Sequence, residues 1–382
     1  MFDYIVVGAG LAGCVMAERI ATLLDKKVLI IEKRSHVGGN CYDYYDENGI
    51  LVHKYGPHIF HTNLEDVWGY LSQFTDWYHY QHHVLGFIDG KNVPIPFNLN
   101  SLHGLLPESK AKDLEGKLIK KFDLNNKVPI LELKKSEDED LKFLAEFVYE
   151  KVFLNYTKKQ WGLTPEELDP SVTERVPVYL SKDDRYFQDK YQGLPKDGYY
   201  KLFQKMLKNP NIKIMLNTDF KELIKVENNE IYFEDKKFEG KLIFTGKIDE
   251  LFSYEFGELP YRSLKFESET LDEEYFQEVG TVNYPNNYEF TRITEFKHLT
   301  GQKNEKTSII REYPKAYDVG KDIPYYPIPK KECNELYETY LEKSLKINNL
   351  ILVGRLAEYR YYNMDVVVSE AFKKFEEILN EQ

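Results

Sequence analysis

The chain begins with a pattern of apolar and polar positions that is typical of a parallel β-sheet covered by a helix. An apolar run at 2–7 (FDYIVV) leads into glycines, a stretch of helical periodicity follows to Leu24, and a second apolar run at 27–31 ends at Glu32. Short, continuous apolar runs on both sides of a helix indicate strands that are buried on both faces. The pattern therefore predicts a strand–turn–helix–strand unit at the start of the chain.

The middle of the chain has a different pattern. Two prolines in the segment 81–101 favour short strands and loops over a helix. From 102 to about 161 the apolar residues follow helical spacing, and the stripe from Leu141 to Val148 is more typical of a core than of a binding site. We expect a helical domain here.

A long connection follows these helices. Residues 171–198 are rich in Pro, Asp, Tyr and Gly, and they make a longer connection than compact domains usually contain. A segment of this kind is either disordered or a functional lid.

The remainder of the chain returns to strands. Alternation at 280–313 predicts antiparallel strands separated by turns. The other elements that the pattern predicts are a helix near 200–207, strands of the N-terminal type near 213–216, 230–233 and 241–244, a helix near 331–346, a strand at 350–353 and a closing helix from about 365 to 379. The predicted fold class is α/β, with a first domain built from separated segments.

Composition excludes several classes of partner. The 382 residues include 51 basic and 63 acidic ones, and the formal net charge of −12 argues against a surface for nucleic acid or for an anionic membrane. No apolar run approaches the roughly 18 residues of a membrane span, and the N-terminus lacks the cationic start of a signal peptide. We therefore expect a cytoplasmic protein with no nucleic-acid or membrane partner.

The residue types that commonly bind metals do not form a metal-site pattern. Cys14, Cys41 and Cys333 have no CxxC spacing and are too few for a disulfide framework, so we interpret them as packing thiols. His58 and His61 lie three residues apart, but no third and fourth ligand stands at a suitable spacing. No metal site is predicted.

A glycine motif predicts dinucleotide binding. Gly8, Gly10 and Gly13 form a GxGxxG pattern between the first strand and the first helix, and Glu32 follows Gly13 by 19 residues at the end of the second strand. Such a turn lets the helix N-terminus face a pyrophosphate, and the acid can accept hydrogen bonds from ribose hydroxyls. The alternative is a tight glycine turn that serves packing alone.

A second glycine pair indicates which dinucleotide is bound. Gly38 and Gly39 precede Asn40, and small residues there allow backbone N–H groups to approach a second phosphate. This extension is typical of flavin-binding members of the fold. Gly354 and Arg355, which follow the last predicted strand and precede the closing helix, could contact the far end of a flavin dinucleotide. The predicted cofactor is FAD.

The sequence around Arg292 predicts an anionic partner for this residue. Alternation in FTRITEFKH places Arg292 on one strand face with Phe290 and Thr294. Unpaired charge on an inward face is costly, so an anionic partner is expected there.

A series of motifs along nearly the whole chain matches one known enzyme family. The matching segments are YIVVGAGLAG, IIEKRSHVGGN, HKYGPHIFHTN, NYTKKQWG, ERVPV, RYFQDKYQG, YRSLKFE, FTRITEFKH, REYP and GRLAEYRYYNMD. GxGxxG is shared by many unrelated enzymes, whereas HIFHT, YTKKQWG and GRLAEYRYY in this order are specific. On these motifs the sequence resembles the bacterial UDP-galactopyranose mutase family.

The resemblance implies a fold of three domains and a reaction. The reaction interconverts UDP-galactopyranose and UDP-galactofuranose on reduced FAD, through a covalent bond between flavin N5 and sugar C1 and with no net redox change. It also implies an external reductant such as NAD(P)H or a reductase, a homodimer, and a role in furanose supply for surface polysaccharides. The implied domains are an FAD-binding Rossmann-type domain (1–80, 199–247 and 347–382), a helical domain (102–198) with a mobile substrate lid at about 171–192, and an antiparallel-sheet substrate domain (81–101 and 248–346).

The resemblance also implies site residues. The catalytic set is Arg292, Arg355, His61 and Arg175, and Arg175 is the lid arginine that would close over the diphosphate. The implied substrate residues are Tyr156, which would stack on uracil, and Thr157, Trp161, Arg175, Tyr186, Arg262, Asn283, Arg292, Tyr313 and Tyr361. The implied cofactor residues are Gly8, Gly10, Leu11, Ala12, Gly13, Glu32, Lys33, Arg34, Gly39, Asn40, His58, Ile59, His61, Phe220, Gly354, Arg355, Tyr361, Asn363 and Met364.

Two departures from the family pattern affect substrate choice. Asn363 stands where many members have Asp, and Glu174 precedes the lid arginine where a basic or neutral residue is common. These changes leave open an N-acetyl or deoxy hexose and a nucleotide other than UDP. Alternatives from other classes are an FAD-dependent amine oxidase or desaturase, which would show a net redox reaction, and a flavin-binding protein without activity.

Overall fold

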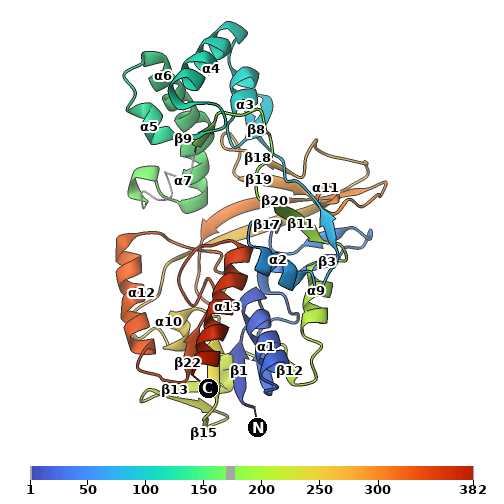
Figure 1. Ribbon diagram of the computed structural model, residues 1–382, viewed down its shortest axis with the longest axis vertical. Coiled ribbons are helices and arrows are strands. Elements are labelled where there is room, and N and C mark those ends of the chain that lie inside the picture. Colours follow the sequence, from blue (N-terminus) through green and yellow to red (C-terminus); the bar gives the residue numbers. More distant parts are fainter. Residues whose placement is uncertain (1, 169–176, 382) are drawn as a thin grey trace. The chain divides into compact units, whose positions relative to one another are not determined.

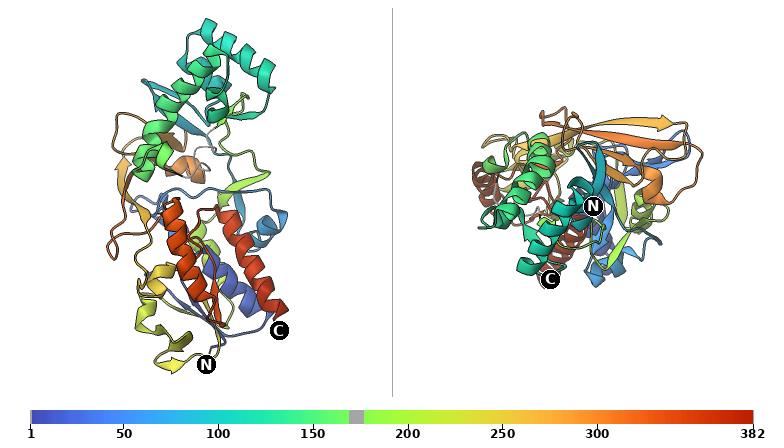
Figure 2. Two further views of the ribbon diagram at one scale, coloured as in Figure 1. Left: turned by 90° about the vertical axis from the view of Figure 1, so that its left-hand side faces the viewer. Right: turned by 90° about the horizontal axis from the view of Figure 1, so that it is seen from above.

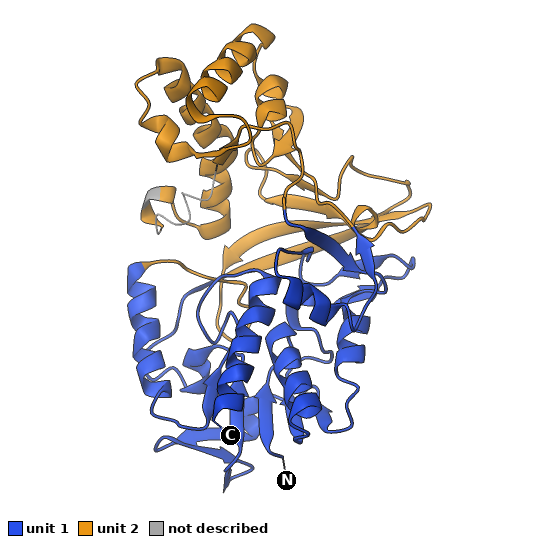
Figure 3. Cartoon of the chain, viewed as in Figure 1, with its two compact units in different colours: residues 1–79, 189–261, 331–382 blue, residues 80–188, 262–330 orange. Residues whose placement is uncertain are grey.

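The computed structural model describes residues 2–168 and 177–381, which form a mixed α/β structure (Figure 1). The chain divides into two compact units, shown in different colours in Figure 3. Unit 1 comprises Met1–His79, Asp189–Tyr261 and Lys331–Gln382, and unit 2 comprises Tyr80–Gln188 and Arg262–Lys330. Each unit is therefore assembled from segments that are distant in the sequence.

Unit 1 is built on a parallel sheet of five strands. Its order is β12 (Ile212–Met215), β2 (Val28–Ile31), β1 (Tyr4–Val7), β16 (Lys241–Phe244) and β22 (Leu350–Leu352). All four pairings are parallel. Every residue of β1 and β2 is buried, as expected for strands that are covered on both faces. The predicted strand–turn–helix–strand unit is confirmed.

Helices cover this sheet. α1 (Leu11–Leu23) and α13 (Met364–Asn380) lie side by side although they come from opposite ends of the chain (Figures 1 and 2). Apolar side chains of these two helices and of β1 and β2 share one core, which also includes α9 (Tyr199–Met206). The remaining helices of unit 1 are α2 (Glu65–Leu71), α10 (Ile248–Leu251), α12 (Lys331–Ser344) and the 3₁₀ turns Gly39–Cys41 and Phe220–Glu222.

Three small antiparallel sheets complete unit 1. They are β5–β11–β6 (Phe60–Thr62, Tyr191–Pro195, Trp77–His79), β3–β4 (Asp43–Tyr45, Leu51–His53) and β13–β14–β15 (Ile224–Glu227, Glu230–Phe233, Lys236–Lys237). The sequence predicts β14 as part of the parallel sheet, which is wrong. Asn228 and Asn229 both adopt positive φ (52° and 62°), so they form a tight hairpin that pairs β14 with β13 instead.

Unit 2 contains a mixed sheet of seven strands. Its order is β21 (Tyr326–Pro327), β17 (Tyr261–Leu271), β20 (Thr307–Ala316), β19 (Arg292–Glu295), β18 (Thr281–Asn283), β7 (Val84–Ile88) and β8 (Lys91–Ile95). Strands β17, β20, β19 and β18 pair antiparallel in succession, as do β7 and β8, whereas β18 pairs parallel with β7. The short helix α11 (Phe296–Thr300) follows β19.

The described helices of unit 2 other than α11 gather at one end of that unit (Figure 3). They are α3 (Leu99–Leu105), α4 (Glu108–Phe122), α5 (Ile130–Lys134), α6 (Glu139–Val148), a π-helical turn (Tyr149–Leu154), α7 (Asn155–Trp161) and a 3₁₀ turn (Pro165–Glu167). β9 (Lys127–Pro129) pairs with β10 (Pro177–Tyr179) beside them. Leu141, Leu144 and Val148 are buried in their core, so the predicted apolar stripe is a packing face.

The division into units differs from the three domains that the sequence analysis predicts. The predicted helical and antiparallel-sheet segments fall largely into the single unit 2. The segment 331–346, predicted with the sheet, contains α12 and belongs to unit 1.

Candidate functional site

Three glycine-rich turns of unit 1 approach one another. Gly8 has φ +98°, and a Cβ on Gly13 would lie 2.1 Å from the carbonyl oxygen of Gly8. A Cβ on Gly39 would lie 2.8 Å from Cα of Gly10, and one on Gly354 would lie 3.2 Å from Cβ of Ala12. Only glycine permits such close backbone approach. The turns after β1, β2 and β22 therefore meet at the start of α1, which is the geometry of a dinucleotide cradle.

The predicted acid of this cradle is in place. Glu32 is buried, and its two carboxylate oxygens accept hydrogen bonds from the backbone N–H groups of Ala9 and Arg34, each at 2.8 Å. Each oxygen has a second lone pair that can accept a ribose hydroxyl. Glu32 thus ties the first glycine turn to the end of β2.

Arg34 offers an unsatisfied donor beside Glu32. Its guanidinium lies 4.4 Å from the ring centroid of Tyr55, and Nη2 donates to Oδ1 of Asn40 at 3.0 Å. Nη1 is buried and has no hydrogen-bond partner within the described ranges. Buried donors without a partner are costly, so this atom fits a site for an adenosine or phosphate group.

Two histidines of the HIFHT segment differ in their environment. His58 Nδ1 lies 2.8 Å from the carbonyl oxygen of Gly56, which makes Nδ1 the protonated nitrogen. Burial lowers the pKa of His58 to about 4, so the ring is neutral at pH 7 with Nε2 as an acceptor. His61 Nδ1 lies 3.0 Å from Oδ2 of Asp189, and Asn63 donates to the other oxygen of that carboxylate at 2.7 Å.

The remaining predicted cofactor residues also lie in unit 1. The guanidinium of Arg355 lies 4.6 Å from the ring centroid of Tyr361, which is 46 % exposed. The sulfur of Met364 lies 3.5 Å from Sγ of Cys41. Lys33 and Asn363 are exposed, Leu11 and Ile59 are half-buried, and Phe220 packs edge-to-face on Phe244 at 5.1 Å.

A row of polar residues crosses one face of the sheet in unit 2. Strand register places Glu312, Arg292 and Asn283 opposite one another on β20, β19 and β18. The next row on the same face holds the buried pair Thr294 and Thr281. In each of these five residues one side-chain polar atom is buried without a hydrogen-bond partner among the described residues, although the two such atoms of Arg292 and Glu312 form an ion pair with each other. Such a concentration of unsatisfied groups on one face indicates a ligand site.

Arg292 is the charged centre of this row. Its Nη2 donates to the hydroxyl of Tyr156 on α7 at 3.0 Å, and its Nε lies 3.3 Å from Oε1 of Glu312. The Arg292 side chain is 25 % exposed, whereas that of Glu312 is 4 % exposed. Burial raises the pKa of Glu312 above its usual 4.5, while Arg292 acts in the opposite direction.

α7 carries three of the predicted substrate residues. Thr157 is buried, Tyr156 reaches Arg292, and the ring of Trp161 lies 6.0 Å from that of Tyr326. Arg262, predicted to line the substrate, instead donates from Nε to the carbonyl of Gln160 at 3.0 Å and from Nη2 to that of Lys159 at 3.2 Å. These bonds satisfy the last carbonyls of the helix.

Lys159 fixes the neighbouring loop. Its Nζ donates to the carbonyls of Tyr284, Tyr288 (3.0 Å) and Phe290 (3.1 Å). Burial lowers the pKa of Lys159 to about 8.

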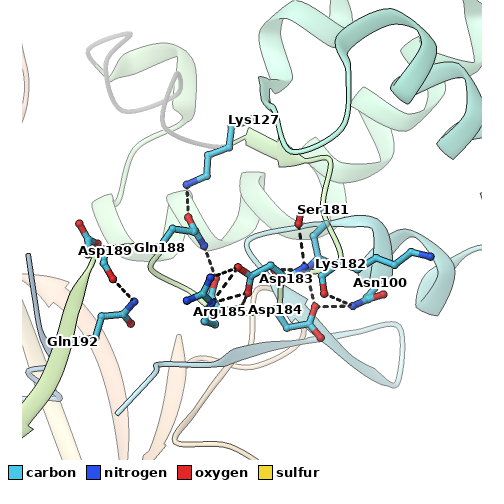
Figure 4. A network of polar contacts seen from close by, with 11 residues as sticks. Asn100, Lys127, Ser181, Lys182, Asp183, Asp184, Arg185, Gln188, Asp189 and Gln192 are labelled. Carbon is cyan, nitrogen blue, oxygen red and sulfur yellow. Dashed lines mark hydrogen bonds and ion pairs between the residues drawn. The ribbon is translucent and has the colours of Figure 1, made fainter. Parts of the chain in front are cut away.

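The described part of the predicted lid is held by a polar network (Figure 4). Arg185 pairs with Asp183 at 2.6 Å, and Asn100 donates to Asp184 at 2.9 Å. The backbone of Tyr186 donates to the carbonyl of His82 at 2.7 Å, and its ring meets that of His82 edge-to-face. Glu174 and the predicted lid arginine, Arg175, lie outside the described residues.

The structure separates one predicted substrate residue from Arg292. Tyr313 follows Glu312 on β20, so its side chain lies on the opposite face of the sheet, where it meets the ring of Phe290 at 5.9 Å. Phe290 lies just before β19, and its ring lies on the same face of the sheet as that of Tyr313. Alternation predicts Phe290 and Arg292 on one face because it assumes an extended strand, whereas the strand begins only at Arg292.

Three polar residues of the two sites were not predicted. Glu312 and Asp189 are acids within quoted motifs, REYP and RYFQDKYQG, and their partners come from other strands. Lys159 is one of two adjacent lysines, and the sequence gives no sign which is buried. Within the described chain no group of three or more His, Cys, Asp or Glu could hold a metal ion, and no helix is long and apolar enough to span a membrane.

A Rossmann-like unit with a glycine cradle, in one chain with a sheet that carries a row of buried polar residues, is typical of a nucleotide-dependent enzyme. A family model described as NAD(P)-binding Rossmann-like domain matches residues 6–74, and one described as UDP-galactopyranose mutase matches residues 151–361. The chain belongs to the UDP-galactopyranose mutase family, and it is an enzyme of the mutase type.

Curated relatives and a solved structure agree with this assignment. The chain is 37% identical over 386 residues to a UDP-galactopyranose mutase of Mycoplasma pneumoniae, covering 99% of this chain and 96% of the relative. It is 36% identical over 377 residues to a dTDP-fucopyranose mutase of Escherichia coli, covering 98% and 97%. The fold matches a crystal structure of reduced UDP-galactopyranose mutase with a TM-score of 0.76 at 18% identity, covering 100% of this chain and 94% of that one.

Proposed function

We propose that this sugar-nucleotide mutase interconverts UDP-galactopyranose and UDP-galactofuranose, with reduced FAD and without net redox change. The observation that carries the proposal is Arg292 on its buried sheet face, hydrogen-bonded to Tyr156 of α7. A guanidinium in a partly desolvated setting binds a diphosphate with charge-assisted, often bidentate hydrogen bonds. Tyr156 next to it offers a ring on which uracil can stack.

FAD is the proposed cofactor, and the residues of unit 1 fit it. The glycine turns at Gly8 and Gly39 would hold the pyrophosphate, while Glu32 and the unsatisfied Nη1 of Arg34 would hold the adenosine half. His58, His61, Arg355, Tyr361 and Asn363 are the residues proposed around the isoalloxazine. When bound and reduced, FAD supplies a nucleophilic nitrogen, N5, for the anomeric carbon of the sugar.

The side chains of the protein then have defined tasks. Arg292 stabilises the negative charge that develops on UDP as the bond to the sugar breaks. Neutral His58 presents an acceptor at Nε2, and His61, oriented by Asp189, is the residue that can hold or release a proton. Arg175 is proposed to add a second positive charge over the diphosphate.

The identity of the sugar is the second part of the proposal. UDP-galactose is favoured by the UDP-galactopyranose mutases among the relatives, and a deoxy sugar on dTDP is the alternative favoured by the E. coli relative. Asn363, in place of the Asp of many family members, is where we expect substrate preference to be set.

Purified protein should therefore be incubated with UDP-galactofuranose and, separately, with dTDP-fucofuranose, with FAD oxidised and with FAD reduced by dithionite. Chromatography should show UDP-galactopyranose only after reduction. Conversion of the dTDP sugar alone would favour the deoxy-sugar mutase. A product formed with net consumption of an oxidant would favour the amine oxidase or desaturase class, and binding of FAD with no conversion in any arm would contradict the proposed activity.

Three further properties belong to this proposal. An external reductant, NAD(P)H or a reductase, is needed to start the cycle, and the enzyme is expected to act as a homodimer. Cys14, Cys41 and Cys333 are buried and none of them forms a disulfide in the described structure, as expected in a reducing compartment, and we place the enzyme in the cytoplasm. Gel filtration with light scattering tests the dimer.

A further inference from the structure

Glu312 is a buried acid next to the arginine to which the proposed function assigns the diphosphate. It is 3 % exposed and lies directly across the strand pair from Arg292. A second negative charge at an anion site opposes ligand binding, and a buried carboxylate with one cationic partner is costly. The position therefore needs a physical explanation that the proposed function does not give.

The contacts of the Arg292 guanidinium explain why an acid is buried at this position. Nε lies 3.3 Å from Oε1 of Glu312, and Nη2 donates to the hydroxyl of Tyr156 at 3.0 Å. The two partners come from different elements, β20 and α7. A guanidinium is planar and rigid, so two contacts on different nitrogens fix both its position and its plane.

We propose that Glu312 is a positioning residue, which holds Arg292 by its Nε edge so that the Nη edge faces the pyrophosphate of the substrate. Glu312 itself does not touch the ligand. The residues of the same row support this role. On β17, Glu312 is paired with the apolar residue Phe266, and on β18, Arg292 is paired with Asn283. Among these four described residues of the row, Glu312 is thus the one acid.

The same sheet offers a matched control on its other face. Arg311 and Glu269 form a similar arginine–carboxylate pair between β20 and β17, at 2.7 Å, with side chains 26 % and 44 % exposed. This pair is partly exposed to solvent, which screens it, so it contributes less than a buried pair would. Substitution of Glu269 by Gln therefore removes one negative charge from the sheet but leaves the contacts of Arg292 unchanged.

The experiment measures UDP and uridine binding to the oxidised holoenzyme by calorimetry, for wild type and for E312Q, E312D, E312L and E269Q. The ratio of the two dissociation constants isolates the pyrophosphate, because uridine lacks it. E312Q keeps an acceptor at the same distance, so we expect this ratio to change less than about threefold. E312D withdraws the acceptor and E312L removes it, so we expect UDP affinity to fall about tenfold or more at unchanged uridine affinity.

Other outcomes overturn the inference. Equal losses for UDP and uridine would show a merely structural role, and a loss in E312Q but not in E312D would show that charge, not contact, matters. An E312L that does not fold leaves E312D to decide. Failure of wild type to bind UDP would contradict the proposed function, whereas wild-type binding with unchanged ratios in all variants would contradict the role of Glu312 alone.

Discussion

At the scale of single residues, several charged or titratable groups of the two candidate sites are held by polar groups from other parts of the chain. Glu32 accepts two backbone N–H groups from different turns, and His61 on β5 is held by Asp189, which lies two residues before the neighbouring strand β11. Preorientation of this kind reduces the entropy that must be lost when the ligand binds. The consequence is that conservative substitutions at these positions should change binding or rate without unfolding the protein.

Arg292→Lys is the first such substitution. Lysine keeps the charge but has one nitrogen, so it cannot contact Glu312, Tyr156 and a phosphate in the same plane. We expect UDP to bind about 10- to 100-fold more weakly, the loss of one or two charge-assisted hydrogen bonds, with unchanged thermal stability within about 2 °C. Calorimetry measures the affinity, and Arg311→Lys, on the other face of β20, is the control that should bind UDP like wild type.

Asp189→Asn tests the orientation of His61. Asn63 donates to Oδ1 of Asp189 and is itself fixed by the backbone N–H of Lys190, so the oxygen of the introduced amide would face Asn63 and its NH₂ would face His61. Because an NH₂ group facing Nδ1 needs an acceptor there, we expect Nδ1 to lose its proton and Nε2 to carry one. We expect kcat to fall about tenfold or more, as for other orienting partners of functional histidines.

The tautomer itself can be observed for this variant. Imidazole ¹⁵N–¹H correlation spectra should show a Nδ1-protonated His61 in wild type and an Nε2-protonated one in Asp189→Asn, with FAD content unchanged. An unchanged tautomer together with full activity would contradict both the orientation by Asp189 and the assigned role of His61.

At the scale of elements, α7 is the helix that carries the proposed nucleotide-binding residues Tyr156, Thr157 and Trp161. Its last carbonyls accept hydrogen bonds from Arg262, and its Lys159 holds the loop between β18 and β19. Burial lowers the pKa of Arg262, in agreement with a guanidinium that is used for structure rather than held in solvent. We interpret Arg262 as the clamp of this helix.

Arg262→Met should loosen the helix as a whole. Both the proposed stacking of uracil on Tyr156 and the contact of Tyr156 with Arg292 depend on α7, so UDP and uridine affinities should fall together, by about tenfold. The loss of two hydrogen bonds to carbonyls should lower the free energy of unfolding by about 1–3 kcal/mol. Calorimetry and denaturant titration measure the two effects. A loss confined to UDP would mean that Arg262 contacts the phosphates instead.

The elements show how far the sequence allowed prediction. The strand–turn–helix–strand start, the amphipathic stripe of α6 and the closing helix were predictable, because local periodicity decides them. The eleven-residue β17 was missed because its exposed half carries charged residues in place of clear alternation. Glu312 and Asp189 were missed for a different reason: their function lies in partners that only strand pairing brings near.

At the scale of the whole chain, distant segments meet at the glycine turns of unit 1, and this makes one glycine decisive. A Cβ on Gly13 would lie 2.1 Å from the carbonyl oxygen of Gly8, which is a backbone atom and cannot move away as a flexible side chain could. We expect Gly13→Ala to purify without FAD or to be insoluble. Gly116→Ala, on α4 with nothing within 4 Å of the added Cβ, should instead raise stability by about 0.5–1 kcal/mol. The ratio of FAD absorbance to protein measures the first effect, and normal FAD content in Gly13→Ala would contradict the cradle.

The pH dependence of stability is a property of the whole chain to which buried histidines contribute. His53 is 1 % exposed, and its Nδ1 accepts the backbone N–H of His58 at 3.0 Å. Burial lowers the pKa of His53 from 6.5 to about 3. Below pH 6.5 the unfolded chain therefore binds a proton that the folded chain excludes, and stability falls as the pH falls. Asp43 acts in the opposite direction below about pH 6, because burial raises its pKa to about 6.

The contribution of His53 is isolated by comparison with His53→Asn, since the Asn side chain offers an acceptor near the position of Nδ1 but does not titrate. Between pH 6.5 and 5 we expect wild type to lose about 1.7 kcal/mol more of its unfolding free energy than the variant loses, because the slope rises from half of 1.36 kcal/mol per pH unit at pH 6.5 toward about that value at pH 5. Denaturant titrations at both pH values, with excess FAD, measure this difference. Parallel pH profiles of wild type and His53→Asn would mean that His53 is solvated in the folded enzyme. The turn that presents His58 to the proposed flavin site would then be solvated too.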